Sequence, residues 1–219
     1  MISLDAGAIR GAVSEDVAAR LFSFEVFPEI ESTNSYLMQQ VAPPPGQASV
    51  ALTDNQTMGR GRHGRTWQSP PGSGLCVSVG FTFSTKPANL PALTLAIGLG
   101  AIAALESLGV SGVQLKWPND LVAGNGKLGG ILTETRSHMS GAISIVSGLG
   151  INVHLGEKPR PGVETDWAHG IADLAGFVDT LPSRDTLAAR LIDGLCTTFI
   201  DYEAGGFEHF VARWPDCDW

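Results

Sequence analysis

The sequence predicts an α+β domain with a mostly antiparallel or mixed sheet and helices packed on it. Residues 75–83 alternate apolar side chains with small or polar ones, which is typical of a half-buried strand. Residues 93–108 place apolar side chains at helical spacing, and Gly109 suits the C-cap of that helix. Residues 183–206 predict a second, amphipathic helix that ends near Gly205. Short strands mixed with segregated helices indicate the α+β class.

A short helix comes before the first of these strands. Residues 32–40 predict it, with Ser32 or Thr33 near its N-cap, because a hydroxyl there can accept a hydrogen bond from a backbone amide. The proline-rich residues 42–47 follow as a stiff loop. Further strands are expected at residues 48–53, 112–117, 127–136 and 142–153, and residues 156–180 are expected to be loop-rich with one short helix.

The composition is that of a soluble globular protein. Hydrophobic residues make up 43% of the chain and charged residues 16%. The length of 219 residues is enough for one domain of ordinary to large size or two small ones. A net charge of −8 repels nucleic acid, so an anion-binding site has to be built locally. The cysteines are three and far apart, which favours a reduced, cytoplasmic setting. The longest uncharged apolar stretch, residues 90–105, is shorter than the roughly 20 residues that span a bilayer, so no membrane is expected as partner.

The stretch GRGRHGR at residues 59–65 has the G-x-G-x-x-G spacing of a dinucleotide-binding turn. That turn must open a helix, but two prolines and two glycines follow within residues 65–74 and prevent one. A solvated basic loop is the usual interpretation of a charge run. Here the three glycines let the backbone approach a ligand, and the arginines supply forked donors. The stretch therefore predicts a clamp for a small anion. Binding of nucleic acid would need a wider basic surface, and the rest of the sequence does not indicate one.

Two other glycine patterns are interpreted as structural. Residues 98–103, GLGAIA, lie within the predicted helix of residues 93–108, where glycine permits close packing. Residues 124–130, GNGKLGG, do not form a phosphate-binding P-loop. Leu121 stands where that motif needs its first glycine, and Leu128 where it needs a serine or threonine.

Five separated motifs occur together in one order. They are STN at residues 32–34, GRGRHGR at 59–65, KWPND at 116–120, GKLGGIL at 126–132 and GLGINV at 148–153. In this order and spacing, residues 30–214 resemble the catalytic domain of the biotin protein ligases, also called biotin–acetyl-CoA-carboxylase synthetases.

The resemblance implies a class II synthetase-like α+β fold with a central mixed sheet, shared with lipoate ligases. It implies formation of biotinoyl-5′-AMP from biotin and ATP, with pyrophosphate released. The biotinoyl group would then pass to one lysine of the biotin carboxyl carrier protein of acetyl-CoA carboxylase. Mg²⁺ would be bound through the ATP phosphates, and the protein side chains alone are not expected to form a metal site.

The resemblance also assigns roles to residues. Those expected at biotin are Ser32, Thr33, Asn34, Gln56, Gly59, Arg60, Gly61, Arg62, Lys127 and Gly130, with Gly129 beside them. Those expected at ATP or the adenylate are Arg60, Arg62, Arg65, Trp67, Asn119, Lys127 and Asn152. The catalytic set would be Arg62, Lys127 and Asp120.

Elementary electrostatics agrees with the cationic part of this set. Adenylation brings a carboxylate and an α-phosphate together, so fixed cations such as Arg60, Arg62 and Lys127 suit the reaction. In the transfer step Asp120 could accept a proton or orient the incoming amine, and the sequence leaves both roles open.

The family pattern frames the rest of the chain. Residues 1–29 are expected as a linker with a first helical segment, and residues 215–219 as a tail. A helix-turn-helix before the domain and a small β-barrel cap after it, known in the family, are not expected within this chain. The alternatives are a lipoate or octanoate ligase of the same fold and a non-catalytic biotin-binding or carrier-binding domain. The sequence also leaves open a homodimer.

Overall fold

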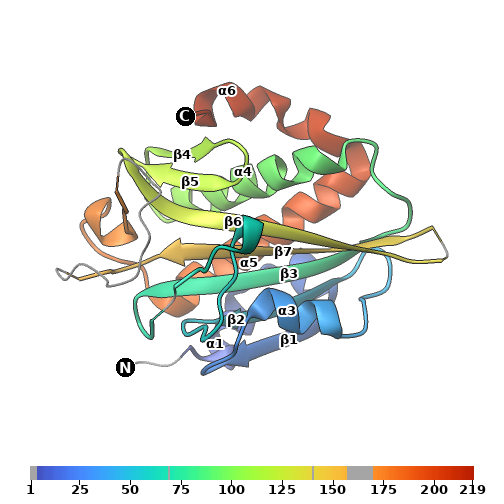
Figure 1. The fold of residues 1–219 in the computed structure, drawn as a ribbon, viewed down its shortest axis with the longest axis horizontal. Helices are drawn as coiled ribbons and strands as arrows, with labels where there is room; N and C mark the ends of the chain where they lie inside the picture. Colours follow the sequence, from blue (N-terminus) through green and yellow to red (C-terminus); the bar gives the residue numbers. More distant parts are fainter. Residues whose placement is uncertain (1–3, 69, 140, 157–169) are drawn as a thin grey trace.

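The computed structural model describes residues 4–68, 70–139, 141–156 and 170–219. Its centre is a seven-stranded sheet in the order β1-β2-β3-β7-β6-β5-β4 (Figure 1). The first two strands pair in parallel and every other neighbouring pair is antiparallel. The expectation of a mixed, mostly antiparallel sheet is thus confirmed. The strands are β1 (Leu21–Phe27), β2 (Ala48–Thr53), β3 (Gly74–Phe83), β4 (Val113–Lys116), β5 (Asp120–Ala123), β6 (Gly126–Ser137) and β7 (Ile143–Asn152).

Helices lie on both faces of the sheet. The α-helices are α1 (Ala6–Ala12), α2 (Glu15–Ala18), α3 (Thr33–Gln39), α4 (Leu93–Glu106), α5 (Arg184–Gly205) and α6 (Trp214–Cys217). The short 3₁₀ segments are η1 (Arg62–Gly64), η2 (Leu90–Ala92), η3 (Leu174–Gly176) and η4 (Gly206–Arg213). In Figure 1 α3 and η1 lie in front of the sheet, whereas α4 and α5 lie behind it.

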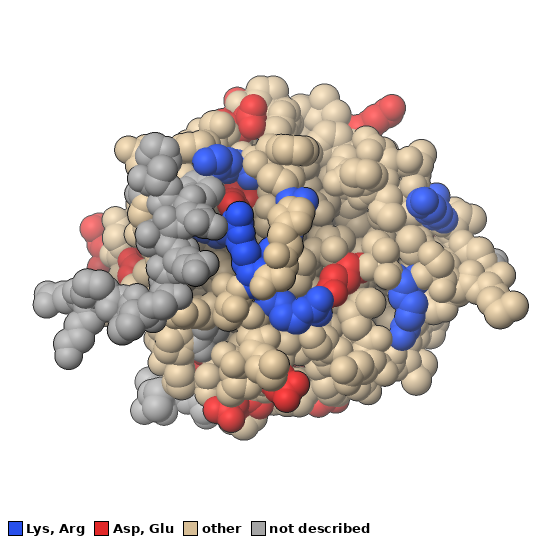
Figure 2. All heavy atoms as spheres, viewed as in Figure 1, with Lys and Arg blue, Asp and Glu red and all other residues tan. Residues whose placement is uncertain are grey.

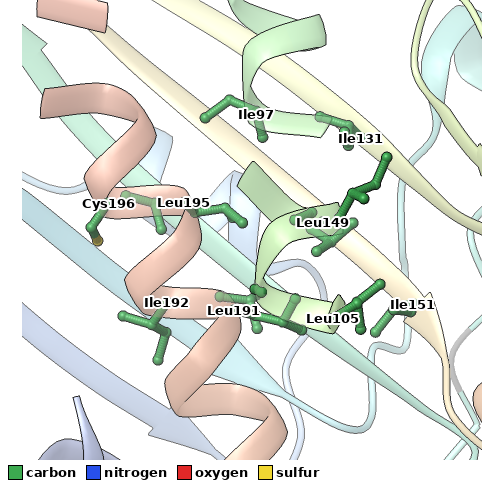
Figure 3. Close-up of a cluster of buried hydrophobic side chains, with 14 of the residues drawn as sticks. Ile97, Leu105, Ile131, Leu149, Ile151, Leu191, Ile192, Leu195 and Cys196 are labelled. Carbon is green, nitrogen blue, oxygen red and sulfur yellow. The ribbon is translucent and has the colours of Figure 1, made fainter. Parts of the chain in front are cut away.

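The main core fills the space between α4, α5 and the sheet. Figure 3 shows this packing for Ile97 and Leu105 of α4, for Leu191, Ile192, Leu195 and Cys196 of α5, and for Ile131, Leu149 and Ile151 of the sheet. The two helices approach closely because glycines meet: a Cβ on Gly194 would lie 2.6 Å from the Gly100 carbonyl oxygen. A Cβ on Gly98 would lie 2.5 Å from Leu115. The interpretation of residues 98–103 as a close-packed core helix is confirmed.

Several predicted element ends agree with the structure. Ser32 is the N-cap of α3, and its side chain accepts a hydrogen bond from the Ser35 amide. The long C-terminal helix ends at Gly205 as expected. Helix α4 ends at Glu106, short of the predicted residue 108, and Gly109 takes a left-handed φ of 81° in the following turn. Of the loop-rich stretch at residues 156–180, residues 157–169 lie outside the described residues, and the remainder contains η3.

The structure contains a helix within the expected first helical segment and two strands that the sequence pattern did not predict. Helix α1, capped by the Asp5 side chain, buries Ile9, and β1 forms one edge of the sheet, so residues 4–27 are part of the packed fold. Strand β5 begins at Asp120, the last residue of KWPND. At the other edge of the sheet, the expected tail contains the end of α6, and the Trp219 amide donates a hydrogen bond to the Leu115 carbonyl of β4. Within the described residues, none of the helices has the length and apolar character needed to cross a membrane.

Candidate active site

A cavity of about 1000 Å³ opens on the sheet face that carries α3. Its walls are the start of α3, the loop of residues 55–68, the turn between β4 and β5, and the facing ends of β3, β6 and β7. Figure 2 shows Lys and Arg side chains near the middle of this face, with Asp and Glu side chains beside them. The volume is at the upper end of the usual range for small-molecule sites.

The floor of the cavity is made of small side chains that share one face of the sheet. In the strand register Cys76 of β3 lies opposite Gly150 of β7, and Ser78 lies opposite Gly148. On the other side of β7, Gly150 lies opposite Gly130 of β6. The alternation in residues 75–83 thus points apolar side chains at the helices and these small ones at the cavity.

Two glycines of this floor have no room for a side chain. A Cβ on Gly148 would lie 2.1 Å from the Asn34 Oδ1 atom, and a Cβ on Gly150 would lie 2.4 Å from the Trp67 indole. The glycines of GLGINV therefore let Asn34 and Trp67 lie directly against the sheet. The sequence motif pointed to this strand, but gave no signal for the contacts that require glycine.

A chain of hydrogen bonds crosses the floor from the loop to α3. The Gln56 Oε1 atom accepts from the Thr33 amide at 2.8 Å and from the Thr33 hydroxyl at 3.1 Å. The hydroxyls of Thr33 and Ser78 are 2.7 Å apart, and Ser78 donates to the Asn34 Oδ1 atom at 2.7 Å. Ser32, Thr33 and Asn34 are buried, since all three lie at the start of α3 against the sheet. The motif STN thus supplies side chains that are already oriented.

The glycine- and arginine-rich loop folds back on itself. The Gly61 amide donates to the Arg65 carbonyl at 2.8 Å, and the Trp67 amide donates to the Gly59 carbonyl at 2.9 Å. A Cβ on Gly59 would lie 2.2 Å from the Trp67 carbonyl oxygen, so glycine is required here by the loop's own packing. The apolar side chain of Met58, at the start of this stretch, is 63% exposed and does not anchor the loop.

The cationic side chains of the site have partners within the protein. Arg60 forms an ion pair with Glu134 at 2.7 Å, and Lys127 forms one with Asp120 at 2.6 Å. Arg62 donates to the Asn119 Oδ1 atom at 3.1 Å. An acid and an amide thus engage two of the three arginines of the loop within the protein itself.

The two asparagines of the predicted ATP set are fixed by backbone carbonyls. The Nδ2 atom of Asn119 donates to the Ile131 carbonyl at 3.0 Å, and that of Asn152 donates to the Ala172 carbonyl at 3.0 Å. Both residues line the cavity. Both amides are thus fixed beside the first half of β6, where they can present polar groups to a ligand without rearrangement.

Most of the predicted site residues lie together. Those that line the cavity are Ser32, Thr33, Asn34, Gln56, Arg60, Gly61, Arg62, Arg65, Trp67, Asn119, Asp120, Lys127, Gly130 and Asn152. Gly59 and Gly129 do not line it. Gly129 is packed within the sheet, where a Cβ would lie 2.7 Å from the Gly150 carbonyl oxygen. Other residues line the cavity although the sequence indicated no individual role for them; they include Cys76, Ser78, Trp117, Leu132, Gly148 and Gly150.

The cavity is poorly suited to hold a metal ion by itself. Within the described part of the chain, no three His, Cys, Asp or Glu side chains gather as a metal site. Among the described cavity-lining residues Asp120 supplies the carboxylate, and Lys127 already engages it. A divalent cation that binds here would take ligands from water or from a bound molecule as well as from Asp120.

Comparison with known proteins gives related sequences. The Bifunctional ligase/repressor BirA of Escherichia coli is 36% identical over 197 residues, which cover 90% of this chain and 59% of BirA. The Biotin--[acetyl-CoA-carboxylase] ligase of Mycobacterium tuberculosis is 33% identical over 183 residues, which cover 81% of this chain and 64% of that protein. The chain thus spans less than two thirds of the length of either relative.

A solved structure and a family model agree with these sequences. The Biotin protein ligase from Aquifex aeolicus in complex with biotin and ATP is similar with a TM-score of 0.68 and 25% identity, covering 89% of this chain and 76% of that one. The sequence model of the Biotin/lipoate A/B protein ligase family matches residues 26–152, more than half of the chain. The family match and the shared fold establish that this chain belongs to the biotin/lipoate A/B protein ligase family.

Proposed function

We propose that this chain is the catalytic domain of an ATP-dependent biotin protein ligase, with residues 30–214 carrying the activity. The observation that carries the proposal is one cavity with two chemically different parts. The Gln56–Thr33–Ser78–Asn34 chain is a polar floor, and Arg60, Arg62, Arg65 and Lys127 are cations that line the same space. Biotin has the matching parts, a ureido ring that hydrogen-bonds and a carboxylate that reacts.

In the first step a biotin carboxylate oxygen attacks the α-phosphorus of ATP. A carbon–oxygen–phosphorus anhydride forms, and the bond to the bridging oxygen breaks, so that pyrophosphate leaves. Arg62 and Lys127 are proposed to stabilise the charge that develops between the two anions. Asp120, 2.6 Å from the Lys127 Nζ atom, is proposed to position that ammonium. Mg²⁺ is proposed to arrive on the ATP phosphates, near Asn119 and Asp120.

In the second step the amine nitrogen of an acceptor lysine attacks the biotinoyl carbonyl carbon. The amide C–N bond forms, the bond between that carbon and the phosphate oxygen breaks so that AMP leaves, and the nitrogen loses its surplus protons to Asp120 or to solvent. We propose that Asp120 orients the incoming ammonium. The acceptor is proposed to be the biotin carboxyl carrier protein of acetyl-CoA carboxylase, supported by the name of the mycobacterial relative. We also propose that the protein works in the cytoplasm and that it can form a homodimer.

The rival within the family is a lipoate or octanoate ligase. Thr33, Asn34 and Ser78 are buried, and their polar groups form the floor on which the ligand's ring would lie. A site built to hydrogen-bond its ligand discriminates strongly against an analogue that lacks the matching groups. An acyl chain or a dithiolane ring offers none, so the floor favours biotin.

The test is ATP–pyrophosphate exchange with biotin, lipoate or octanoate as the acid. We expect exchange with biotin and, at equal concentration, at least about hundredfold less with the other two, since unpaired polar groups in a site can reject an analogue by up to about 10⁴–10⁵-fold. Exchange with lipoate or octanoate instead would establish the rival. Biotin binding without exchange would establish the non-catalytic alternative.

A further inference from the structure

Glu134 lies on β6 next to the cavity and was not marked by any motif. Its carboxylate contacts Arg60 through both oxygens, with Oε1 at 2.7 Å from Nη2 and Oε2 at 3.1 Å from Nη1. The Arg60 side chain is 47% exposed, whereas that of Glu134 is only 22% exposed. A two-point contact fixes the plane of a guanidinium as well as its position. Glu134 therefore orients Arg60, and the Ser35 hydroxyl adds a further contact by accepting from Nη1 at 3.1 Å.

The same carboxylate also holds the polar floor. The Asn34 Nδ2 atom donates to Glu134 Oε2 at 3.1 Å and to the Leu132 carbonyl at 3.0 Å. These bonds fix which way the Asn34 amide faces, so that its Oδ1 atom accepts from Ser78. Glu134 thereby orients the donor and acceptor ends of Asn34.

These contacts close a circuit that begins and ends on one loop. From Arg60 it runs to Glu134, Asn34 and Ser78, and then through Thr33 to Gln56. Gln56 and Arg60 both belong to the loop of residues 55–68. The circuit thus ties the cationic loop at two points to the floor of the cavity.

We infer that Glu134 is a positioning residue that sets the cationic loop and the polar floor in register before a ligand binds. Its carboxylate balances the charge of Arg60 in the ligand-free protein, and its second contact keeps Asn34 turned toward Ser78. A ligand then meets both parts of the site already arranged, which lowers the ordering cost of binding. The consequence for biotin rests on the proposed function, but the arrangement of the ligand-free loop does not.

The perturbation is Glu134→Gln, which keeps the size and removes the charge. The glutamine NH₂ group must face a donor of Arg60 or Asn34, so one contact of the circuit is lost. Glu106→Gln is the matched control, because Glu106 forms an ion pair of the same 2.7 Å length with Arg213 outside the cavity. Arg60→Met breaks the circuit from its other end.

The first measurement is amide hydrogen exchange of residues 56–67 in the ligand-free protein. We expect faster exchange in Glu134→Gln and in Arg60→Met, and parental exchange in Glu106→Gln. The second is calorimetry with biotin, in which we expect Glu134→Gln to weaken binding by about tenfold, the range of one lost hydrogen bond to a charged group.

A double-mutant cycle separates positioning from general destabilisation. In the Arg60→Met background the Arg60 contact is already gone, and the glutamine of Glu134→Gln can turn its oxygen toward the Asn34 Nδ2 atom and keep that contact. Glu134→Gln should then change biotin affinity by less than about threefold. Multiplicative effects would overturn the inference, as would parental exchange of residues 56–67 in Glu134→Gln. If the parent protein binds no biotin, the proposed function fails, whereas the exchange experiment still decides the role of Glu134.

Discussion

Adding one methyl group at Gly150 is expected to displace Trp67 from the wall of the cavity. In Gly150→Ala the new Cβ would lie 2.4 Å from Trp67 Cε2 and 2.6 Å from Nε1. Carbon atoms in contact lie about 3.5–4.0 Å apart, so the indole must move by roughly 1 Å. Gly150 lies in β7 between β3 and β6, whereas Trp67 is a loop side chain. The tryptophan and not the strand should therefore give way.

The magnitude follows from the cost of overpacking, about 1–3 kcal/mol. We expect the free energy of unfolding to fall by no more than this, and biotin binding, measured by calorimetry, to weaken by about tenfold or more, since 1.4 kcal/mol is one decade. Gly80→Ala is the matched control: it adds the same methyl to β3, where the nearest atom, Val146 Cγ2, lies at an ordinary 3.6 Å. Parental affinity in Gly150→Ala would refute the reasoning that Trp67 forms a wall of the ligand site.

Three further predictions concern charge, packing and motion. Lys127→Ala should lower the rate of biotin-dependent pyrophosphate exchange by at least about hundredfold, which corresponds to about 3 kcal/mol of activation barrier. Lys86→Ala, which removes an exposed lysine, is the control. A rate for Lys127→Ala within tenfold of the parent would contradict this. Gly194→Ala should lower the free energy of unfolding, measured in urea, by about 1–3 kcal/mol because its new Cβ collides with α4. Gly11→Ala is the control, because its Cβ would have no atom within 4 Å. Equal stability of the two variants would count against this prediction. Residues 55–68, already held by Glu134 and Gln56, should exchange amide hydrogens still more slowly with biotin and ATP than without, because the ligands add contacts to the loop; unchanged exchange on addition of both ligands would contradict this.

The sequence predicts the elements whose signal is local. Residues 93–106 and 184–205 carry a helical pattern of apolar side chains, and residues 75–83 carry the alternation of a strand, so each can be recognised without knowledge of its neighbours. Strand β1 was missed although it alternates, with Phe22, Phe24 and Val26 on one face and Ser23 and Glu25 on the other. Strand β5 has only four residues, too few for a local pattern, and depends on its pairing with β4 and β6.

The same distinction applies to the site. GRGRHGR and KWPND are short motifs with unusual chemistry, and both line the cavity as expected. Glu134 is separated by 74 residues from Arg60 and by 100 residues from Asn34, so the sequence around it gives no hint of either contact. Gly59 shows the converse: its motif was recognised, but the structure places its backbone against Trp67 and not in the cavity.

The internal ion pairs change how ligand binding has to be understood. Two cations of the site, Arg60 and Lys127, are paired with Glu134 and Asp120. A guanidinium has five N–H donors and an ammonium has three, so each side chain can keep its carboxylate and still donate to an anion. An exposed ion pair contributes only about 0–1 kcal/mol, so little holds Glu134 to Arg60 where solvent reaches that pair. The side chains of Lys127 and Asp120 are only 27% and 17% exposed, so separating them costs more. A ligand anion is therefore expected to bind beside these pairs, and the contact between Asp120 and Lys127 is the one that should persist in the complex.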